Sequence, residues 1–155
     1  MPHKNSFYYP TYLFFLLLCN RKTKIYVNLI IDIGNTATKI AIFEQGNIKE
    51  TLRCSNQSLE GLAALCRHYA IQKGILSSVI SINETIRQQL SQLPFPILEF
   101  TYQTSIPIRN LYQTPQTLGV DRLAAVVAAY HQKPHCPALV IDAGTCITYD
   151  FLDEQ

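Results

Sequence analysis

One short pattern occurs twice in the 155-residue sequence and constrains its fold more than any other feature. Residues 31–36 read I-D-I-G-N-T, and residues 141–145 read I-D-A-G-T. Each copy follows an apolar run rich in β-branched residues, which predicts a buried strand, and each precedes a second apolar run. The repeated unit is therefore predicted to be a strand, a turn containing Asp and Gly, and another strand.

The segments between the two copies alternate between strand and helix patterns. We expect strands over residues 26–33, 39–43, 48–53, 75–82, 97–100, 138–141 and 146–151. We expect helices over residues 58–73, 84–93 and 118–131, with Gly74 ending the first and Asn83 capping the second. Residues 101–117 read as a long loop, a kind of segment that is often functional. The pattern predicts an α/β fold, with a mixed sheet and flanking helices.

The two turns carry residues suited to binding phosphate. Glycine lets a backbone approach a ligand closely, and exposed turn N–H groups can surround an anion. Thr36 and Thr145 add hydroxyl donors, and Asp32 and Asp142 offer the carboxylate oxygens that magnesium prefers. A single turn of this kind is more often only a turn. Two of them facing each other would hold the phosphates of a nucleotide from both sides.

A third group of polar residues precedes an Ala-rich helix. An acid in the first turn of a helix is favoured by the helix dipole, which by itself is a sufficient reason for Asp121. It does not explain Gly119, a costly residue in a helix, or the adjacent Arg122. A functional interpretation is that Asp121 accepts a proton from a substrate hydroxyl and Arg122 binds an anionic group.

Charge and cysteine content exclude several classes of protein. Thirteen basic and eleven acidic residues give a net charge of +2, too little to indicate a nucleic-acid partner. Five cysteines without a C-x-x-C pair indicate neither a disulfide framework nor a zinc ribbon, so we expect a reducing, cytoplasmic compartment. His131, His135 and Cys136 lie among prolines, which favours a surface loop over a metal site.

Residues 1–25 differ from the rest of the chain. Their apolar run, residues 12–19, is shorter than the roughly 20 residues that span a bilayer. The basic residues follow this run, whereas a signal peptide has them before it. We expect an extension of doubtful relevance, with no membrane partner, and Val27 is a hypothetical alternative start. N-terminal sequencing of the expressed protein tests this, since an N-terminus near Met1 would contradict it.

Three segments together resemble the type III pantothenate kinase family, within the actin/hexokinase/Hsp70-like phosphotransferase superfamily. They are residues 32–39, residues 112–125 and residues 142–148, and the resemblance covers about residues 27–155. The second segment separates this family from sugar kinases and chaperones of the same fold. The resemblance implies ATP-dependent phosphorylation of pantothenate, the first step of coenzyme A biosynthesis.

The resemblance also implies a role for each matching residue. Asp121 would be the proton acceptor, Asp142 would bind a monovalent cation (potassium or ammonium), and Thr145 would contact ATP, which comes with Mg²⁺. The expected pantothenate contacts are Tyr112, Gly119, Val120, Asp121 and Arg122. The expected ATP phosphate loop consists of Asp32, Ile33, Gly34, Asn35, Thr36, Ala37, Thr38 and Lys39. For Lys39, a solvated lysine at a strand edge is the simpler alternative.

The family's architecture implies a boundary within this chain. Residues 26–134 would form an N-terminal, ribonuclease-H-like (actin-like ATPase) domain, and residues 135–155 would begin a second similar domain. The family is dimeric, and its chains are longer than 155 residues. We therefore expect the chain as given to be a fragment with little or no activity and an uncovered face on its last strand. A coupled ATP and pantothenate assay tests this.

Two other functions stay open. Proteins of this family were first described as Bvg accessory factors, so a non-catalytic regulatory role is one alternative. It would require lost catalytic positions or a basic DNA-binding face, and a salt-dependent DNA-binding measurement would reveal it. The other alternative is a kinase of the same fold with a different acceptor, against which Tyr112 and residues 119–122 favour pantothenate.

Overall fold

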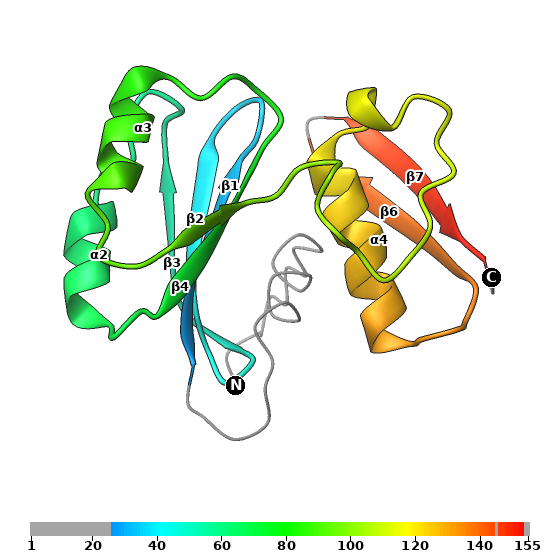
Figure 1. The fold of residues 1–155 in the computed structure, drawn as a ribbon, viewed down its shortest axis with the longest axis horizontal. Helices are drawn as coiled ribbons and strands as arrows, with labels where there is room; N and C mark the ends of the chain where they lie inside the picture. Colours follow the sequence, from blue (N-terminus) through cyan, green and yellow to red (C-terminus); the bar gives the residue numbers. More distant parts are fainter. Residues whose placement is uncertain (1–25, 145, 154–155) are drawn as a thin grey trace, which may run out of the picture.

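The protein, described here from a computed structural model, contains two β-sheets and the helices between them (Figure 1). The structure describes residues 26–144 and 146–153, so the extension over residues 1–25 and Thr145 lie outside it. The strands are β1 (Val27–Ile33), β2 (Thr38–Glu44), β3 (Asn47–Cys54), β4 (Lys73–Ser78), β5 (Ile97–Glu99), β6 (Ala138–Ala143) and β7 (Ile147–Leu152). The helices are α2 (Leu62–His68), α3 (Glu84–Ser91), the 3₁₀ helix η1 (Pro115–Thr117) and α4 (Val120–Gln132).

The larger sheet is mixed, as the sequence predicts. Its five strands run in the order β3-β2-β1-β4-β5, and β6 pairs with β7 in a separate sheet. The pairs β1–β2 and β2–β3 are antiparallel hairpins, whereas β4 pairs in parallel with β1, and β5 pairs in parallel with β4. Parallel neighbours need a crossover connection, and α2 and α3 provide it. The chain therefore has an α/β fold with flanking helices.

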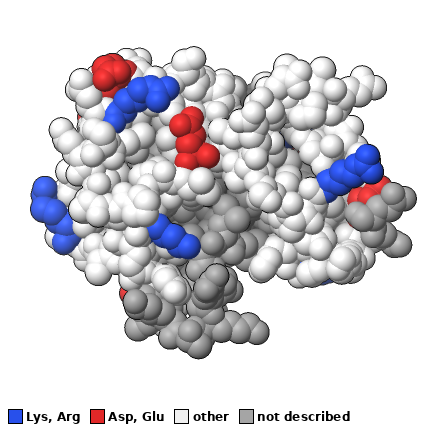
Figure 2. Space-filling view, in the orientation of Figure 1, with Lys and Arg blue, Asp and Glu red and all other residues white. Residues whose placement is uncertain are grey.

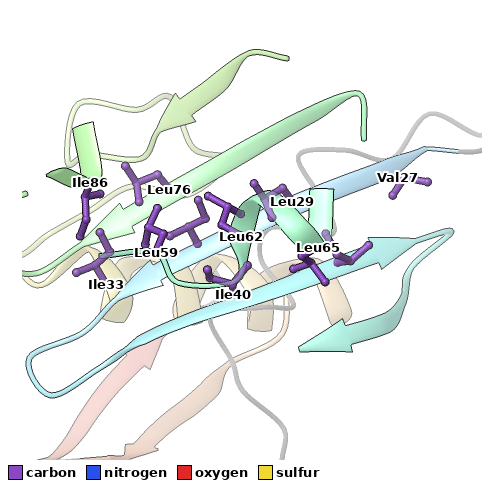
Figure 3. Packing of buried hydrophobic residues seen from close by; sticks show 11 residues of the cluster. Val27, Leu29, Ile33, Ile40, Leu59, Leu62, Leu65, Leu76 and Ile86 are labelled. Atoms are coloured by element: carbon purple, nitrogen blue, oxygen red, sulfur yellow. The ribbon is translucent and has the colours of Figure 1, made fainter. Parts of the chain in front are cut away.

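One face of the larger sheet packs against α2 and α3. The side chains of Leu29, Ile31 and Ile33 point to this face, because alternate residues of a strand share a side. All three belong to one apolar cluster with Leu62 and Leu65 of α2, and Figure 3 shows Leu29 and Ile33 in this layer. Every residue of β1 is buried, which explains its nearly uninterrupted apolar sequence.

The opposite face packs against α4. Ile30, Phe43 and Ile75 of the sheet form one cluster with Ala124 and Val127 of the helix. The alanines allow the helix backbone to approach the sheet closely. Helix α4 also contacts β6 and β7, so it lies between the two sheets (Figure 1).

The first predicted helix is wrong in extent. It runs over Leu62–His68 rather than residues 58–73, and Gly61 at its start has a left-handed backbone with φ 81°. Gly74 does not end a helix; it lies inside β4, in register with Leu29 and Ile97. A Cβ atom there would collide with Ile97 Cδ1. Glycine is thus required for close strand packing rather than for a helix end. The same strand ends at Ser78, not at residue 82. The third predicted helix is shorter at its start than expected: α4 begins at Val120 rather than at residue 118, so Gly119 precedes the helix and is not a residue within it.

Other expectations are confirmed. Asn83 caps α3, with Oδ1 accepting a hydrogen bond from Ile86 N at 2.9 Å. The outward residues of β6 and β7 are exposed, in agreement with the uncovered face expected there; they are Leu139, Ile141, Ile147, Tyr149 and Phe151. Among the described residues, no helix combines the length and apolarity needed to cross a membrane.

Candidate active site

Asp32 lies near the carboxyl end of β1, on the face of the sheet that α4 covers. It is 6% exposed, and its Oδ1 accepts a hydrogen bond from the Ser77 hydroxyl at 2.9 Å. Ser77 is the register partner of Asp32 on β4 and is fully buried. The parallel pairing of two strands distant in sequence therefore supplies the hydrogen bond that a buried carboxylate requires.

The electrostatic surroundings of Asp32 connect all three sequence motifs. Burial raises the pKa of Asp32, while the hydrogen bond from Ser77 and the charge of Lys39 lower it. The charges of Asp121 and Asp142 raise it further. These carboxylates come from three separate motifs, and each must lie near Asp32 to act on it. Their negative charge favours the binding of a cation at this place.

The turn after β1 presents exposed backbone. Gly34 N donates a hydrogen bond to Ala37 O at 3.2 Å, which closes the turn, and Asn35 and Thr36 are exposed. Gly34 does not have a positive φ, so the turn does not require glycine for its backbone conformation. What glycine provides here is the absence of a side chain beside the peptide groups of the turn.

The start of α4 explains why glycine precedes Asp121. Asp121 Oδ1 accepts a hydrogen bond from Arg122 N at 2.8 Å, which turns the carboxylate back over Gly119. A Cβ atom on Gly119 would lie 2.5 Å from this same oxygen. Gly119 therefore leaves room for the Asp121 carboxylate in the position that it occupies.

Arg122 and Tyr112 meet at a pocket between α4, the preceding loop and β7. The guanidinium lies 5.8 Å from the centre of the Tyr112 ring, a cation–π arrangement. The pocket has a volume of about 370 Å³, and its lining includes Tyr112, Arg122, Tyr149 and Asp150. The anionic group that Arg122 meets in this structure is the carboxylate of Asp150. The structure thus brings Tyr112 and Arg122, both expected to contact pantothenate, to the lining of one pocket.

Asp142 lies on β6 directly opposite Thr148 on β7. Residues paired in this way share a face of the hairpin. Thr148 Oγ1 is buried and has no hydrogen-bond partner among the described residues. The described part of the chain contains no group of three or more His, Cys, Asp or Glu side chains arranged to hold a metal ion. Any cation here would need other oxygen ligands besides these side chains.

Comparison with known proteins identifies the family. Residues 28–155 match the family model described as type III pantothenate kinase. The chain belongs to the type III pantothenate kinase family.

Several curated type III pantothenate kinases are similar to this chain. That of Phocaeicola vulgatus is 58% identical over 127 residues, and one of Bacteroides fragilis is 54% identical over the same length; each match covers 82% of this chain and 52% of the relative. That of Christiangramia forsetii is 39% identical over 131 residues, covering 83% of this chain and 54% of the relative. The chain therefore spans about half the length of the type III pantothenate kinases that it matches.

Three residues that form hydrogen bonds to the candidate site were not predicted from the sequence. Ser77 holds Asp32, Asp150 holds Arg122, and Asn56 holds the turn after β1. Ser77 ends a buried strand and Asn56 lies in a loop, so neither belongs to a recognisable motif. Alternation along β7 offered a weak signal for Asp150, because an acid on the inward face of an apolar strand requires a partner.

Proposed function

We propose that this protein phosphorylates pantothenate with ATP, the first step of coenzyme A biosynthesis. The observation that carries the proposal is that Asp32 is buried near the end of β1, where the Ser77 hydroxyl donates to it, and that the charges of Asp121 and Asp142 both raise its pKa. The three carboxylates come from three different motifs. Membership of the type III pantothenate kinase family supports pantothenate as the acceptor.

The turn after β1, residues 32–39, is the proposed phosphate loop. Its exposed residues Asn35 and Thr36 bring backbone N–H groups to the surface, where they can donate to phosphate oxygens. Lys39 pairs in register with Asp32 and places a positive charge beside it. Thr145, which lies outside the described residues, is proposed as a further ATP contact.

Mg²⁺ fits this set of oxygen ligands when it is bound together with a nucleotide. Magnesium in kinases is commonly held by one or two carboxylates, water and the substrate's phosphates. Asp32 offers one such carboxylate, and among the described residues no side-chain cage of three or more acidic, His or Cys ligands surrounds it. When bound, the ion would neutralise negative charge on the phosphate groups.

Asp121 is the proposed proton acceptor for the hydroxyl of pantothenate. Its Oδ1 is held by Arg122 N, while its Oδ2 makes no hydrogen bond to the described residues. That second oxygen is the one available to a substrate hydroxyl. The ion pair of Arg122 uses Nε and Nη2, so Nη1 remains to meet the carboxylate of pantothenate, with Tyr112, Gly119 and Val120 completing the substrate contacts.

Asp142 is the proposed ligand of a monovalent cation, potassium or ammonium. Thr148 Oγ1 on the opposite strand supports this assignment, because this atom is buried and has no hydrogen-bond partner among the described residues. A hydroxyl oxygen beside a carboxylate gives a cation two adjacent ligands. Cation binding would satisfy an oxygen that is otherwise left without a partner.

The wider organisation is proposed on the family resemblance. Residues 26–134 would form a ribonuclease-H-like (actin-like ATPase) domain, and the β6–β7 hairpin within residues 135–155 would begin a second one. The separate pairing of β6 with β7 supports that division. We further propose a homodimer that acts in the cytoplasm.

A chimera tests the function directly. Residues 28–155 of this chain would replace the matching segment of the Phocaeicola vulgatus relative, and ADP release would be measured with pantothenate present and absent. We expect pantothenate-dependent turnover that falls by about 10²- to 10⁴-fold in Asp121→Asn. A folded chimera without turnover, or with turnover independent of Asp121, would contradict the proposal. Phosphorylation of a different acceptor would instead favour another kinase of this fold.

No observation favours the regulatory alternative. On the face shown in Figure 2, Lys and Arg side chains lie apart from one another rather than in one patch. Nucleic-acid binding depends on a concentrated basic surface. The kinase function is therefore the one proposed.

A further inference from the structure

Asn56 contacts the proposed phosphate loop although it belongs to none of the three motifs. It follows β3, and its side chain reaches the turn after β1. Its Nδ2 donates hydrogen bonds to Gly34 O at 2.7 Å and to Asn35 O at 3.3 Å. Its Oδ1 accepts a hydrogen bond from Thr38 Oγ1 at 2.9 Å. One amide side chain thus holds both ends of the turn.

Both halves of the amide are used. Thr38 is fully buried, so its hydroxyl needs the acceptor that Asn56 provides. The carbonyl groups of Gly34 and Asn35 need donors, which the same side chain supplies. An aspartate in this position would place a second acceptor against two carbonyl oxygens. An alanine would leave all three groups without this partner.

These contacts fix the direction of the turn's N–H groups. In a trans peptide the C=O and N–H groups point in opposite directions. The carbonyls of Gly34 and Asn35 point toward Asn56, so the N–H groups of Asn35 and Thr36 point away from it. The N–H groups of these two exposed residues therefore point to the same side of the turn, away from Asn56, which is the arrangement in which consecutive turn amides bind an anion.

Asn56 is itself held in place by α3. Asn83 Nδ2 donates to Asn56 O at 3.0 Å and to Gln57 O at 3.2 Å. The other half of the same side chain, Oδ1, caps α3 through Ile86 N. Hydrogen bonds therefore connect the start of a helix, through two asparagines, to the turn after β1.

We propose that Asn56 is a positioning residue that orients the peptide groups of residues 34–36 for phosphate binding. The inference rests on the proposed function, because the ligand it serves is the phosphate chain of ATP. Asn56 would not touch the nucleotide. It would act by holding the Asn35 and Thr36 N–H groups in the direction that the phosphates require.

The test uses the full 155-residue chain labelled with ¹⁵N, with the amide signals of Asn35 and Thr36 as a readout and ATP with Mg²⁺ as the probe. In Asn56→Ala we expect these two signals to shift or broaden without nucleotide, and the Kd for ATP to rise about tenfold. Asn56→Asp, which keeps the acceptor for Thr38, should show the same two effects. Asn47→Ala is the matched control, because Asn47 also bonds a turn carbonyl, Gln45 O, at the opposite end of the β2–β3 hairpin.

The outcomes are separable. Unchanged Asn35 and Thr36 signals in folded Asn56→Ala would overturn the inference, as would altered signals with an unchanged Kd. If Asn56→Ala does not fold, Asn83→Ala provides the test, because it removes the support of Asn56 and should produce smaller changes of the same kind. Failure of the unmodified chain to bind ATP would count against the proposed function. It would also overturn the phosphate role of Asn56, while the nucleotide-free signals would still show whether Asn56 orients the turn.

Discussion

Arg122 on α4 and Asp150 on β7 form a two-point ion pair. Arg122 Nε donates to Asp150 Oδ2 at 3.0 Å, and Nη2 donates to Oδ1 at 2.7 Å. The pair joins the helix that carries Asp121 to the hairpin that carries Asp142. The hydrogen bonds that Arg122 donates to Asp150 raise the pKa of Arg122, so the guanidinium stays charged. This pair therefore connects the helix of the second motif to the hairpin that contains the third.

A double-mutant cycle should show strong coupling between these two side chains. We expect a coupling free energy of about 1–3 kcal/mol between Arg122→Ala and Asp150→Ala. The reason is that the two hydrogen bonds of the ion pair join charged groups that are only partly exposed. Urea unfolding of the four variants measures the coupling. The pair Lys49–Glu44 is the control, since it is more exposed and should give less than about 1 kcal/mol. Equal coupling in the two cycles would contradict the structural argument.

Replacing Asp32 by asparagine should stabilise the folded chain at neutral pH. Burial raises the pKa of Asp32 above its ordinary value of 3.8. Below pH 3.8 the Asp32 carboxyl is protonated in both the folded and the unfolded chain. As the pH rises from there through the raised pKa of the folded chain, the free energy of unfolding decreases. Asn cannot ionise and keeps the acceptor for Ser77. The melting temperature of Asp32→Asn should therefore exceed that of the unmodified chain more at pH 7 than at pH 4.

An exposed carboxylate serves as the control for this pH dependence. Glu99→Gln removes a carboxylate from an exposed position, and its melting temperature is measured at the same two pH values for comparison. A constant difference in melting temperature between Asp32→Asn and the unmodified chain across this range would be incompatible with a buried, ionising Asp32.

Gly119→Ala should reduce activity with little loss of stability. The new methyl group would meet Asp121 Oδ1 and displace the carboxylate, whereas the surrounding backbone need not move. We expect turnover of the chimera to fall by at least about tenfold, with unfolding free energy changed by less than about 1 kcal/mol. In combination with Asp121→Asn, Gly119→Ala should cause no further loss, because both changes act through one carboxylate. If Gly119→Ala reduces turnover further in the Asp121→Asn background, it does not act through the Asp121 carboxylate, and this mechanism is wrong.

Gly74→Ala should destabilise the sheet by about 1–3 kcal/mol. Its methyl group would meet Ile97 Cδ1 and lie 3.2 Å from Leu29 O, inside a fully packed layer. Chemical unfolding measures the loss, and Ile97→Val in the same chain should restore part of it. Gly144→Ala is the stability control, because a Cβ placed there would meet no described residue within 4 Å apart from its neighbours in the chain. If Gly74→Ala leaves the free energy of unfolding unchanged, the strands do not pack as tightly around Gly74 as the structure indicates.

Local sequence patterns predicted the elements with distinctive chemistry. The apolar runs located β1, β2 and the β6–β7 hairpin, and Asn83 marked the start of α3. The helix expected over residues 58–73 was wrong, since helical spacing of apolar residues continued across Tyr69–Gln72, where the chain bends toward β4. Periodicity does not reveal that Gly74 is needed by a neighbouring strand. That requirement comes from the packing of Leu29 and Ile97.

The sequence by itself determined which residues carry charge and hydroxyl groups and which short segments turn. Only the tertiary structure decided their partners: Ser77 for Asp32, Asp150 for Arg122 and Asn56 for the turn after β1. The physical reason is that turn chemistry and strand alternation act over a few residues, whereas Asp32 and Ser77 are 45 residues apart. Their contact depends on the register of two parallel strands, which is fixed by burial of the whole sheet between α4 and the two shorter helices.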